Sequence, residues 1–518
     1  MAEFFSLMNE TLVNSEDNLR LTENGGYGFS STGSKLVDMN FKASRYRNLS
    51  EAEIQDDFAE VCAENLLDAI VWAFFSRDAR GGMGERRLFR ACLQFLADNY
   101  PVQTASVLHL VPEYGRWDDL FVLCGTKLES EAAEIIRQQL TVDLTHADHG
   151  QPVSLVAKWL PSINSHHENT RRKAFSMAKM LGYDRFQYQR IVSGLRKRIR
   201  TVESQMSANK WEEIDYEAVP SKANLIYKGA FLRHDEERRR KFLGELTSGE
   251  KKINSKTLFP YEIVRNYRNA WGGSVVDDAT LEGLWKALPD YVNGQGNTIV
   301  VADGSGSMMS SVGNSTVTCL DVAQSLAIYF AERLGEPFHN KYITFSSNPQ
   351  LVNLGDGSLN SKLKISRRHS ECSNTDIAKV FDLILRTAVQ NHLRQDEIPQ
   401  RILIISDMEF DETTTEWSWR PGHGSVRTTT FDKTVFGKIK ARFEEKGYKL
   451  PRLVFWNVCS RTNTIPVKEN DLGVALVSGF SPSIAKMVFS NKLDPAEILS
   501  EQLHDERYLP IWNELLPS

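Results

Sequence analysis

The sequence predicts two domains of different class, an all-α domain in the N-terminal half and an α/β domain with a mainly parallel sheet in the C-terminal half. First, the chain has 518 residues, more than one ordinary core holds. Second, apolar residues recur every three or four positions from about Glu51 to Tyr267, as in amphipathic helices. Third, short aliphatic runs alternate with helical segments from Asn297 onward. A hydrophobic fraction of 41% with 25% charge is typical of a folded chain.

The first 50 residues have a different composition from the rest. Their stretch LTENGGYGFSSTGSKLVDMNF is rich in Gly, Ser and Asn, which favour turns over regular helices. Residues 1–50 are therefore expected to form an extended arm that packs on the helical domain.

Residues 51–289 are expected to form that helical domain. Stretches such as ERRLFRACLQFLADNY place apolar residues at helical spacing, and proline and glycine divide the region into segments of roughly 10 to 20 residues. The sequence shows no repeat of fixed period. Helix after helix without intervening strands suggests a stacked, HEAT-like helical array.

Residues 290–518 are expected to form the α/β domain, including its C-terminal helices. The predicted strands TIVVAD, KYITFS, RILIISD, RLVFWNVC and VALVSG alternate with predicted helices such as CLDVAQSLAIYFAERLG. Strands this apolar are buried on both faces, which requires a mainly parallel sheet covered by helices on each side. Ligands of such sheets bind beyond the carboxyl ends of the strands.

Oxygen-bearing side chains follow three of these segments and suggest a metal site. The first segment is DGSGS, in which Gly304 and Gly306 are expected to let the chain turn tightly so that alternate side chains converge. The second is SNTDI, and the third is IISDMEF. Carboxylates and hydroxyls are the hard ligands that Mg²⁺ prefers, with water completing the octahedron. The candidate ligands of Mg²⁺, or of another divalent cation, are Asp303, Ser305, Ser307, Thr375 and Asp407.

These residues also have simple structural interpretations. Asp303 and Ser305 could cap the following helix, and Thr375 is a good N-cap for its own helix. Three segments spread over about 100 residues nevertheless end at the same predicted sheet edge, which favours the metal site. Glu409 and Asp411 follow Asp407 and could crowd or supplement it.

The order Asp-x-Ser-x-Ser, then Thr, then Asp resembles the metal-ion-dependent adhesion site (MIDAS) of von Willebrand factor A domains. The resemblance implies that the serines and the threonine contact the metal more directly than the acids, which often act through water. It also implies an exchangeable position that accepts a carboxylate from a partner. Such a site binds and does not catalyse, and no hydrolase or nucleotide-binding motif is present in the sequence. We therefore expect a protein that is not an enzyme.

Basic residues cluster in the helical half. The net charge of −5 means that any attraction for nucleic acid must come from a local patch. The stretch RFQYQRIVSGLRKRIR contains no acid, and Phe186 and Tyr188 within it are candidates for base stacking. A solvated helix face, or a surface that holds acidic helices of the other domain, is the alternative. The candidate RNA-binding residues are Arg171, Arg172, Lys173, Arg185, Arg190, Arg196, Lys197, Arg198 and Arg200.

The glycine-rich stretch RGGMGERRLFR, Arg80 to Arg90, lacks the lysine-hydroxyl end of a phosphate-binding loop. A flexible turn between helices is the favoured interpretation over a nucleotide site.

A second resemblance covers most of the chain. The stretches TENGGYGFSSTGSKLVDM, RGGMGERRLF, AKWLPSINS, LRKRIRTVESQMSANKWEEIDYEAVPSKA and VADGSGSM resemble an uncharacterised domain family of bacteria, plants and large DNA viruses. That family is similar in plan to the Ro, or TROVE, proteins. The resemblance implies a ring of helical repeats, closed by a von Willebrand A domain, that holds single-stranded ends of small misfolded RNAs. The RNA-contacting positions of Ro proteins have no residue-by-residue match in this sequence.

The remaining features concern the compartment. The six cysteines show no metal-binding spacing and are expected as reduced thiols. No stretch approaches the roughly 18 apolar residues of a membrane helix, and the acidic N-terminus does not fit a secretory signal. We expect a cytoplasmic protein without membrane contact. The leading hypothesis is a non-enzymatic, Ro-like RNA-binding protein with a metal site. The alternative is a scaffold that docks an acidic partner loop on the metal without RNA, and a metal-assisted hydrolase is the weakest candidate.

Overall fold

The computed structural model describes residues 18–25, 27–199, 201–268, 277–294, 297–313, 315–345, 349–369, 377–410, 417–420, 424–427 and 435–516. The chain divides into two compact units. The sheet unit consists of residues 1–49 and 258–502, and the helical unit of residues 50–257 and 503–518. A helical region followed by a mostly parallel sheet confirms the coarser part of the predicted fold class, an all-α region and an α/β domain. Among the described residues, no helix combines the length and apolar character needed to cross a lipid bilayer.

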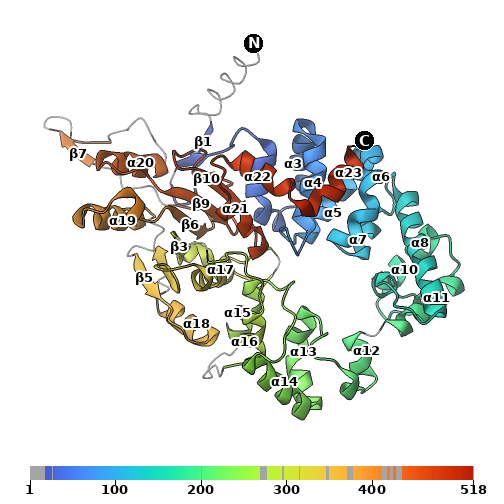
Figure 1. The fold of residues 1–518 in the computed structure, drawn as a ribbon. Helices are drawn as coiled ribbons and strands as arrows, with labels where there is room; N and C mark the ends of the chain where they lie inside the picture. Colours follow the sequence, from blue (N-terminus) through green and yellow to red (C-terminus); the bar gives the residue numbers. More distant parts are fainter. Residues whose placement is uncertain are drawn as a thin grey trace. The chain divides into compact units, whose positions relative to one another are not determined.

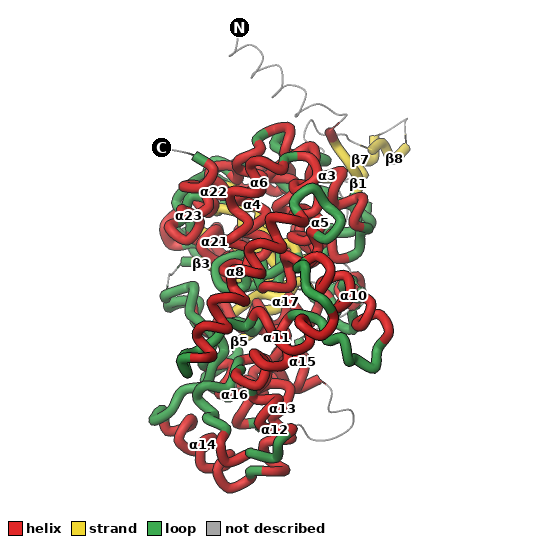
Figure 2. The backbone as a smooth tube through the Cα atoms, turned by 90° about the vertical axis from the view of Figure 1, so that its right-hand side faces the viewer, coloured by secondary structure: helices red, strands yellow, loops and turns green. Residues whose placement is uncertain are grey.

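The described part of the helical unit contains helices and no strands, as the predominance of red in Figure 2 illustrates. Its α-helices are α3 (Glu51–Glu64), α4 (Leu66–Arg77), α5 (Arg86–Asn99), α6 (Pro101–Val107), α7 (Val111–Tyr114), α8 (Glu129–Asp148), α9 (Val156–Trp159), α10 (Glu168–Met180), α11 (Arg185–Arg198), α12 (Val202–Ser207), α13 (Ser221–His234), α14 (Glu236–Ser248) and α23 (Leu509–Leu515). A 3₁₀ helix, η4 (Trp117–Leu123), precedes α8, and another, η9 (Glu506–Tyr508), precedes α23.

A single residue divides the first long apolar stretch of the helical unit. Asn65 adopts an extended conformation between α3 and α4, and its side chain accepts hydrogen bonds from the N–H groups of Leu67 and Asp68. This cap begins α4, whose residues from Ala69 to Arg77 are all buried. Helix α4 is therefore the central helix of this part of the core.

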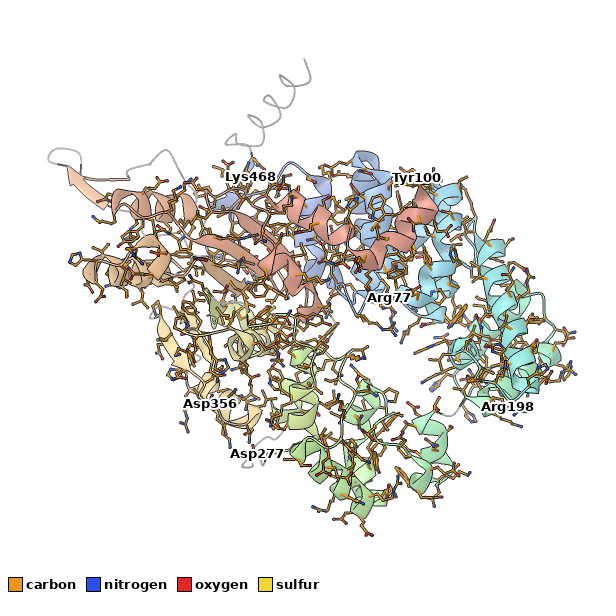
Figure 3. The ribbon with its side chains drawn as sticks, viewed as in Figure 1. Arg77, Tyr100, Arg198, Asp277, Asp356 and Lys468 are labelled. Atoms are coloured by element: carbon orange, nitrogen blue, oxygen red, sulfur yellow. The ribbon has the colours of Figure 1, made fainter. Side chains whose placement is uncertain are left out.

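A buried ion-pair network joins α4, α5 and η4. Asp119, fully buried, accepts hydrogen bonds from Nε of Arg77 at 2.7 Å and from Nε of Arg90 at 2.6 Å. Its Oδ2 also accepts the N–H of Arg116 at 2.9 Å. Figure 3 labels Arg77 at the end of α4. One carboxylate thus pairs with two guanidinium groups and fixes the start of η4, and Arg90 pairs in addition with Asp118 at 2.7 Å.

The C-terminal segment belongs to the helical unit, which corrects the predicted 290–518 domain. Helix α23 packs against α4 and α6. The guanidinium of Arg507 pairs with the buried carboxylate of Asp78, and the ring of Tyr508 stacks on Tyr114 with centroids 5.8 Å apart. The aromatic and charged anchors of residues 503–518 lie far from their partners in the sequence, so periodicity alone did not reveal them.

The stretch RGGMGERRLFR is a tightly bonded turn rather than the flexible one expected from its glycines. Backbone N–H groups of Gly82 and Gly84 donate to the carbonyl of Asp78, both at 3.1 Å, and that of Met83 donates to the carbonyl of Phe75. A Cβ on Gly82 would lie 2.0 Å from the carbonyl oxygen of Phe75. Glycine is therefore required here for close backbone approach.

We expect Gly82→Ala to destabilise the helical unit by about 2–4 kcal/mol, because the added methyl group must push apart two hydrogen-bonded backbone segments. Thermal unfolding followed by circular dichroism measures the effect. Gly244→Ala in α14 is the matched control, since a Cβ there would meet nothing within 4 Å. Equal melting temperatures for the two variants would contradict the prediction.

The sheet unit is built on six strands. They are β3 (Thr298–Asp303), β4 (Lys341–Phe345), β5 (Gln350–Asn353), β6 (Arg401–Ser406), β9 (Arg452–Asn457) and β10 (Val474–Ser478). Their order across the sheet is β10-β9-β6-β3-β4-β5, and every neighbouring pair is parallel except β4 with β5 (Figure 1). The predicted parallel strands are all present. The short antiparallel edge strand β5 was not predicted.

The other elements of the sheet unit surround this sheet. They are the paired strands β1 (Leu19–Leu21) and β2 (Tyr27–Phe29), the paired strands β7 (Trp417–Arg420) and β8 (Gly424–Arg427), and the helices α2 (Lys35–Phe41), α15 (Pro260–Arg268), α16 (Ala279–Lys286), η6 (Gly306–Met309), α17 (Cys319–Arg333), α18 (Leu359–Arg368), α19 (Ala378–Gln390), α20 (Val435–Glu445), α21 (Ala485–Phe489) and α22 (Pro495–Leu503).

Helices cover both faces of the sheet. Phe455 and Trp456 are successive residues of β9, so their side chains point to opposite faces. Phe436 of α20 lies against Phe455, with ring centroids 4.9 Å apart, and Phe330 of α17 lies against Trp456 at 5.3 Å. The full burial of β3, β9 and β10 follows from this two-sided cover.

The N-terminal arm packs on the sheet unit and not on the helical domain as expected. Phe29 pairs with Ile465 through reciprocal backbone hydrogen bonds of 2.7 Å, and the hydroxyl of Thr22 donates to the carbonyl of Phe410 at 2.5 Å. Further along, Asn457 donates to the carbonyl of Phe41. The glycine- and serine-rich composition indicated an extended segment, which is correct for β1 and β2 but wrong for α2 and for the 3₁₀ helix η2 (Ala43–Arg47). The composition contained no information on the partner of the arm.

Residues 258–289 also belong to the sheet unit, which moves the predicted boundary at 289/290. Helix α15 packs against α17, and Nε1 of Trp285 in α16 donates to the carboxylate of Glu332 at 2.7 Å. The hydroxyl of Tyr329 donates to the carbonyl of Pro289 at 2.6 Å. Helices α15 and α16 have the same periodicity as the preceding helices, so the sequence pattern did not separate them.

Candidate metal site at the ends of strands β3 and β6

The candidate site lies at the topological switch point of the sheet. From β3 the chain continues to β4 on one side, whereas β6 pairs with β3 on the other side. At such a point two loops leave the carboxyl edge in opposite directions and open a crevice, where open α/β sheets bind ligands. Asp303 ends β3, and Asp407 directly follows β6.

The loop after β3 brings Asp303, Ser305 and Ser307 together. The N–H of Ser305 donates to Oδ1 of Asp303 at 2.9 Å, which forms a turn closed by the side chain. The hydroxyl oxygens of Ser305 and Ser307 lie 2.9 Å apart. Gly306 has no positive φ, and a Cβ there would meet no atom within 4 Å. The expected steric need for glycine therefore does not hold at position 306.

The loop after β6 turns sharply at a residue other than glycine. Met408 is fully buried and has a φ of 65°, a left-handed conformation that costs roughly 1–2 kcal/mol for such a residue. The turn places Asp407 beside the β3 loop, close enough for Ser307 to lower the pKa of its carboxyl group and for its charge to raise the pKa of Asp303. Asp303, Ser305, Ser307 and Asp407 therefore form one polar cluster.

The two carboxyl groups of the cluster are buried and repel one another. Burial raises the pKa of Asp303, and the neighbouring charge of Asp407 raises it further. Burial likewise raises the pKa of Asp407, although Arg461 and Ser307 act in the opposite direction. A divalent cation between the two groups would relieve both the desolvation and the repulsion.

The donor chemistry of the cluster fits Mg²⁺. Two carboxylates and two hydroxyls provide an all-oxygen set, which hard cations prefer, and they leave coordination positions for water. Within the described residues there is no group of three or more His, Cys, Asp and Glu side chains at metal-binding distances. The hydroxyl-rich cluster is thus the metal-site candidate that this part of the chain offers. Thr375 and Asp411 lie outside the described residues.

Glu409 does not supplement the cluster, contrary to one sequence-based alternative. Its Oε1 accepts from the N–H groups of Arg461 and Thr462 at 2.8 and 2.9 Å, and its Oε2 accepts from the N–H of Glu23 at 2.8 Å. The hydroxyl of Thr462 donates to both carboxylate oxygens. This fully bonded carboxylate ties the loop after β9 and the N-terminal arm to the site.

Three residues that border the cluster were not identified from the sequence. The hydroxyl of Ser406 donates to Oδ2 of Asp303 at 2.6 Å. Nη2 of Arg461 lies 3.3 Å from Oδ2 of Asp407 and 2.5 Å from Oε2 of Glu23. Ser406 could have been found, because it stands next to Asp407 at the end of a predicted strand. Neither Arg461 nor Glu23 belongs to a recognisable motif.

The basic residues of the helical unit fall into two groups. Arg196 is half-buried and donates to the carbonyls of Ala157 and Leu160, and Arg171 donates to the carbonyls of Ser165 and His166. Arg172 pairs with Glu168 at 2.8 Å. These three arginines are therefore engaged locally. Exposed residues that form no ion pair with any described residue are Lys173, Arg185, Arg190, Lys197 and Arg198, and Arg200 lies outside the described part of the chain.

The two candidate stacking residues of α11 differ in exposure. Tyr188 is buried, and its hydroxyl donates to the carbonyl of Pro161 at 2.8 Å, so it is not available to a base. Phe186 is 79% exposed. Phe186, Arg190 and Lys197 lie on one face of α11 because they are spaced at i, i+4 and i+11. Arg198, at the end of α11, is labelled in Figure 3.

Comparisons with known proteins place this chain among uncharacterised relatives. Residues 297–508 match the model of a domain of unknown function, DUF7788, and residues 175–302 match that of another, DUF2828. The chain is 27% identical to Uncharacterized protein L728 of Acanthamoeba polyphaga mimivirus over 535 residues, which cover 96% of this chain and 89% of that protein. These matches confirm part of the predicted resemblance, since families of unknown function and a protein of a large DNA virus are similar to this chain.

One solved structure is also similar. The crystal structure of the Deinococcus radiodurans RO (RSR) protein aligns with a TM-score of 0.46 and 13% identity, over 92% of this chain and 100% of that chain. Such a distant likeness carries no argument about function.

Proposed function

We propose that this chain is a non-enzymatic binding protein whose sheet unit, a von Willebrand A-type domain, holds Mg²⁺ or another divalent cation and docks a carboxylate of an acidic protein partner on it. The single observation that supports this proposal is the clustering of Asp303, Ser305, Ser307 and Asp407 at the switch point. Asp303 and Asp407 come from segments about 100 residues apart, the carboxylate of Asp303 accepts the N–H of Ser305, and the hydroxyls of Ser305 and Ser307 lie 2.9 Å apart.

The chemistry of the cluster favours binding over catalysis. A bound Mg²⁺ supplies a hard positive charge with exchangeable positions, to which a partner carboxylate can coordinate. Ser305 and Ser307 would orient the ion, and the buried acids would balance its charge directly or through water. Hydrolysis would need a general base beside an activated water, and a hydroxyl-rich ligand set supplies little basicity.

Replacing both hydroxyls, as in Ser305→Ala/Ser307→Ala, is expected to weaken Mg²⁺ or Mn²⁺ binding by roughly 10-fold or more, because two neutral oxygen ligands are lost while the charges remain. Isothermal titration calorimetry of the purified full chain measures this. The control is Ser325→Ala, a buried serine of α17 whose hydroxyl donates only to the carbonyl of Val322. Wild-type protein that binds neither ion at millimolar concentration would refute the proposal.

A second candidate function is RNA binding by the helical unit, which we propose to be a HEAT-like array. The observation that favours it is the exposed face of α11, which carries Phe186, Arg190 and Lys197, and neither cation has an ion-pair partner among the described residues. Exposed aromatic rings with adjacent basic groups bind single strands by stacking and phosphate neutralisation. Small structured RNAs with single-stranded ends are the RNA class that fits such a surface.

The charge reversals Arg190→Glu/Lys197→Glu are expected to lower affinity for a single-stranded RNA 20-mer by about 10-fold or more at 100 mM salt and to flatten its salt dependence. Phe186→Ala is expected to cost about 1–3 kcal/mol of binding with the salt slope unchanged. Fluorescence anisotropy provides the readout.

The matched control reverses the charge of two basic residues on α14, in the variant Arg240→Glu/Lys241→Glu. Arg240 pairs with Glu236, and Lys241 lies 3.9 Å from Glu245, so these cations are already partnered. An equal loss of affinity in the control would mean that RNA responds only to net charge. RNA binding by α11 would then be excluded.

A further inference from the structure

One guanidinium nitrogen at the candidate site bridges two carboxylates. Nη2 of Arg461 lies 3.3 Å from Oδ2 of Asp407, which is buried, and 2.5 Å from Oε2 of Glu23, whose side chain is 54% exposed. Nε of Arg461 is buried and has no hydrogen-bond partner among the described residues. Arg461 therefore divides one positive charge between a candidate metal ligand and a carboxylate at the surface.

Backbone contacts fix this arrangement. The N–H of Arg461 and the N–H of Glu23 both donate to the carboxylate of Glu409, at 2.8 Å each. In addition, the side chain of Asn24 donates to the carbonyl of Glu409 at 2.6 Å. Glu409 stands two residues after Asp407, so one loop positions the metal ligand, the guanidinium and the arm together. Only side-chain movement is then needed to change the partner of Arg461.

The charges at the site indicate under which condition Arg461 should exchange Asp407 for Glu23 as its ion-pair partner. In the structure, Arg461 contacts the carboxylate of Asp407 and compensates part of the charge of the buried pair of Asp303 and Asp407. A divalent cation bound there neutralises both carboxylates and repels the adjacent guanidinium of Arg461, whose side chain is 33% exposed. Glu23 already contacts the same nitrogen and can accept the whole guanidinium in a two-point ion pair.

We propose that Arg461 is a built-in counter-cation that a divalent metal ion displaces from Asp407, and that Glu23 of the N-terminal arm receives it. The inference rests on the metal site proposed above and concerns the regulation of that site. It makes metal affinity depend on the arm, since Glu23 lowers the cost of moving Arg461 away from Asp407. By reciprocity, metal binding strengthens the attachment of the arm through the Arg461–Glu23 ion pair.

The competing explanation is a plain field effect, in which each charge acts on the metal independently. Both explanations predict tighter metal binding without Arg461 and weaker binding without Glu23. They differ in the double variant. If Glu23 acts through Arg461, removing Glu23 has little effect once Arg461 is absent, whereas independent charges give additive effects.

The experiment measures Mn²⁺ affinity of the full chain by electron paramagnetic resonance for the wild type, Arg461→Met, Glu23→Gln and the double variant. Methionine keeps the length of the side chain and removes its charge, and glutamine is isosteric with glutamate. We expect Arg461→Met to bind Mn²⁺ about 10-fold more tightly and Glu23→Gln about 5-fold more weakly than the wild type. The double variant should match Arg461→Met within about twofold.

Additive effects in the double variant would overturn the proposal, and so would unchanged affinity in Arg461→Met. Arg461→Lys provides a second test that preserves charge. Lysine keeps the positive charge but cannot form the two-point ion pair of a guanidinium with Glu23. In the Arg461→Lys background, Glu23→Gln should therefore change Mn²⁺ affinity less than it does in the wild type. Full coupling in the lysine background would also contradict the proposal. A wild type without Mn²⁺ binding is a separate outcome, because it refutes the metal site itself and the regulation with it.

Discussion

Asp303→Asn is expected to abolish metal binding while making the metal-free protein more stable. Metal affinity should fall by roughly 100-fold or more, about 2.8 kcal/mol, because a buried ligand charge is lost and even outer partners of a metal contribute 10- to 100-fold. The metal-free protein gains stability because asparagine removes one of two repelling buried charges, and its amide can still accept from the N–H of Ser305 and bond to the hydroxyl of Ser406. Thermal unfolding with and without 5 mM Mg²⁺ tests both expectations, the higher stability without metal and the lost stabilisation by Mg²⁺. This concentration is of the order that weak oxygen-ligand sites require.

The same pair of carboxyl groups makes both the stability of the metal-free protein and its stabilisation by Mg²⁺ depend on pH. The pKa of Asp303 is raised from 3.8 to about 7 in the folded protein, so the folded state retains a proton that the unfolded chain releases between those values. Without metal, stability therefore falls as pH rises through this window. The metal needs the ionised form, so the increase in melting temperature produced by Mg²⁺ should be small near the lower end and grow toward the upper end.

Asp356→Asn provides the control for both measurements. Asp356 is an exposed acid of the same unit that accepts a hydrogen bond from Asn340, away from the cluster (Figure 3). It should leave the response to Mg²⁺ and its pH dependence unchanged. A response to Mg²⁺ that survives in Asp303→Asn would show that the cluster does not hold the ion.

Asp119→Ala is expected to destabilise the helical unit by about 3–5 kcal/mol, the cost of leaving a buried cation without its counter-ion. Its carboxylate is fully buried and is shared by Arg77 and Arg90, so Arg77 loses its ion-pair partner and Arg90 retains only Asp118. Hydrogen exchange of α4 and α5 is the appropriate measurement, since it reports directly on the two helices that carry Arg77 and Arg90.

Glu168→Ala is the matched control, since Glu168 pairs with Arg172 on the surface, where both side chains are more than 70% exposed. Exposed ion pairs contribute about 0–1 kcal/mol, so protection of α4 and α5 should not change. Equal effects of the two substitutions would mean that burial does not determine the contribution of the Asp119 network.

Most of the sheet unit was predictable because its strands combine aliphatic composition with abrupt ends. Runs such as TIVVAD and RILIIS are too apolar for a surface element and too short for an isolated helix, which leaves a buried parallel strand. Strand β5 was missed because QLVN has four residues and an exposed edge, so it lacks that signal. The strands β7 and β8 were missed for a similar reason, since WSWR and GSVR are short and polar.

The candidate site was predictable where chemistry and strand ends coincide in the sequence. Asp303 and Asp407 each close an aliphatic run, and parallel strands bring such ends to one edge. Arg461 and Glu23 were not predictable, because an arginine in the loop SRTNT and a glutamate in the arm have no distinguishing neighbours. Likewise, nothing in the spacing of Arg190 and Arg196 distinguished an exposed cation from one that binds backbone carbonyls.

The return of residues 503–518 to the helical unit affects how this protein can be dissected. The polypeptide passes from one unit to the other after Leu49, after Thr257 and after Gln502. A fragment ending at Thr257 would lose the guanidinium that neutralises Asp78, and one beginning at Leu258 would carry an orphaned C-terminal helix without its own core. A single proteolytic cut at any of these three positions would likewise leave two fragments that remain non-covalently associated. Neither unit can therefore be isolated by one cut.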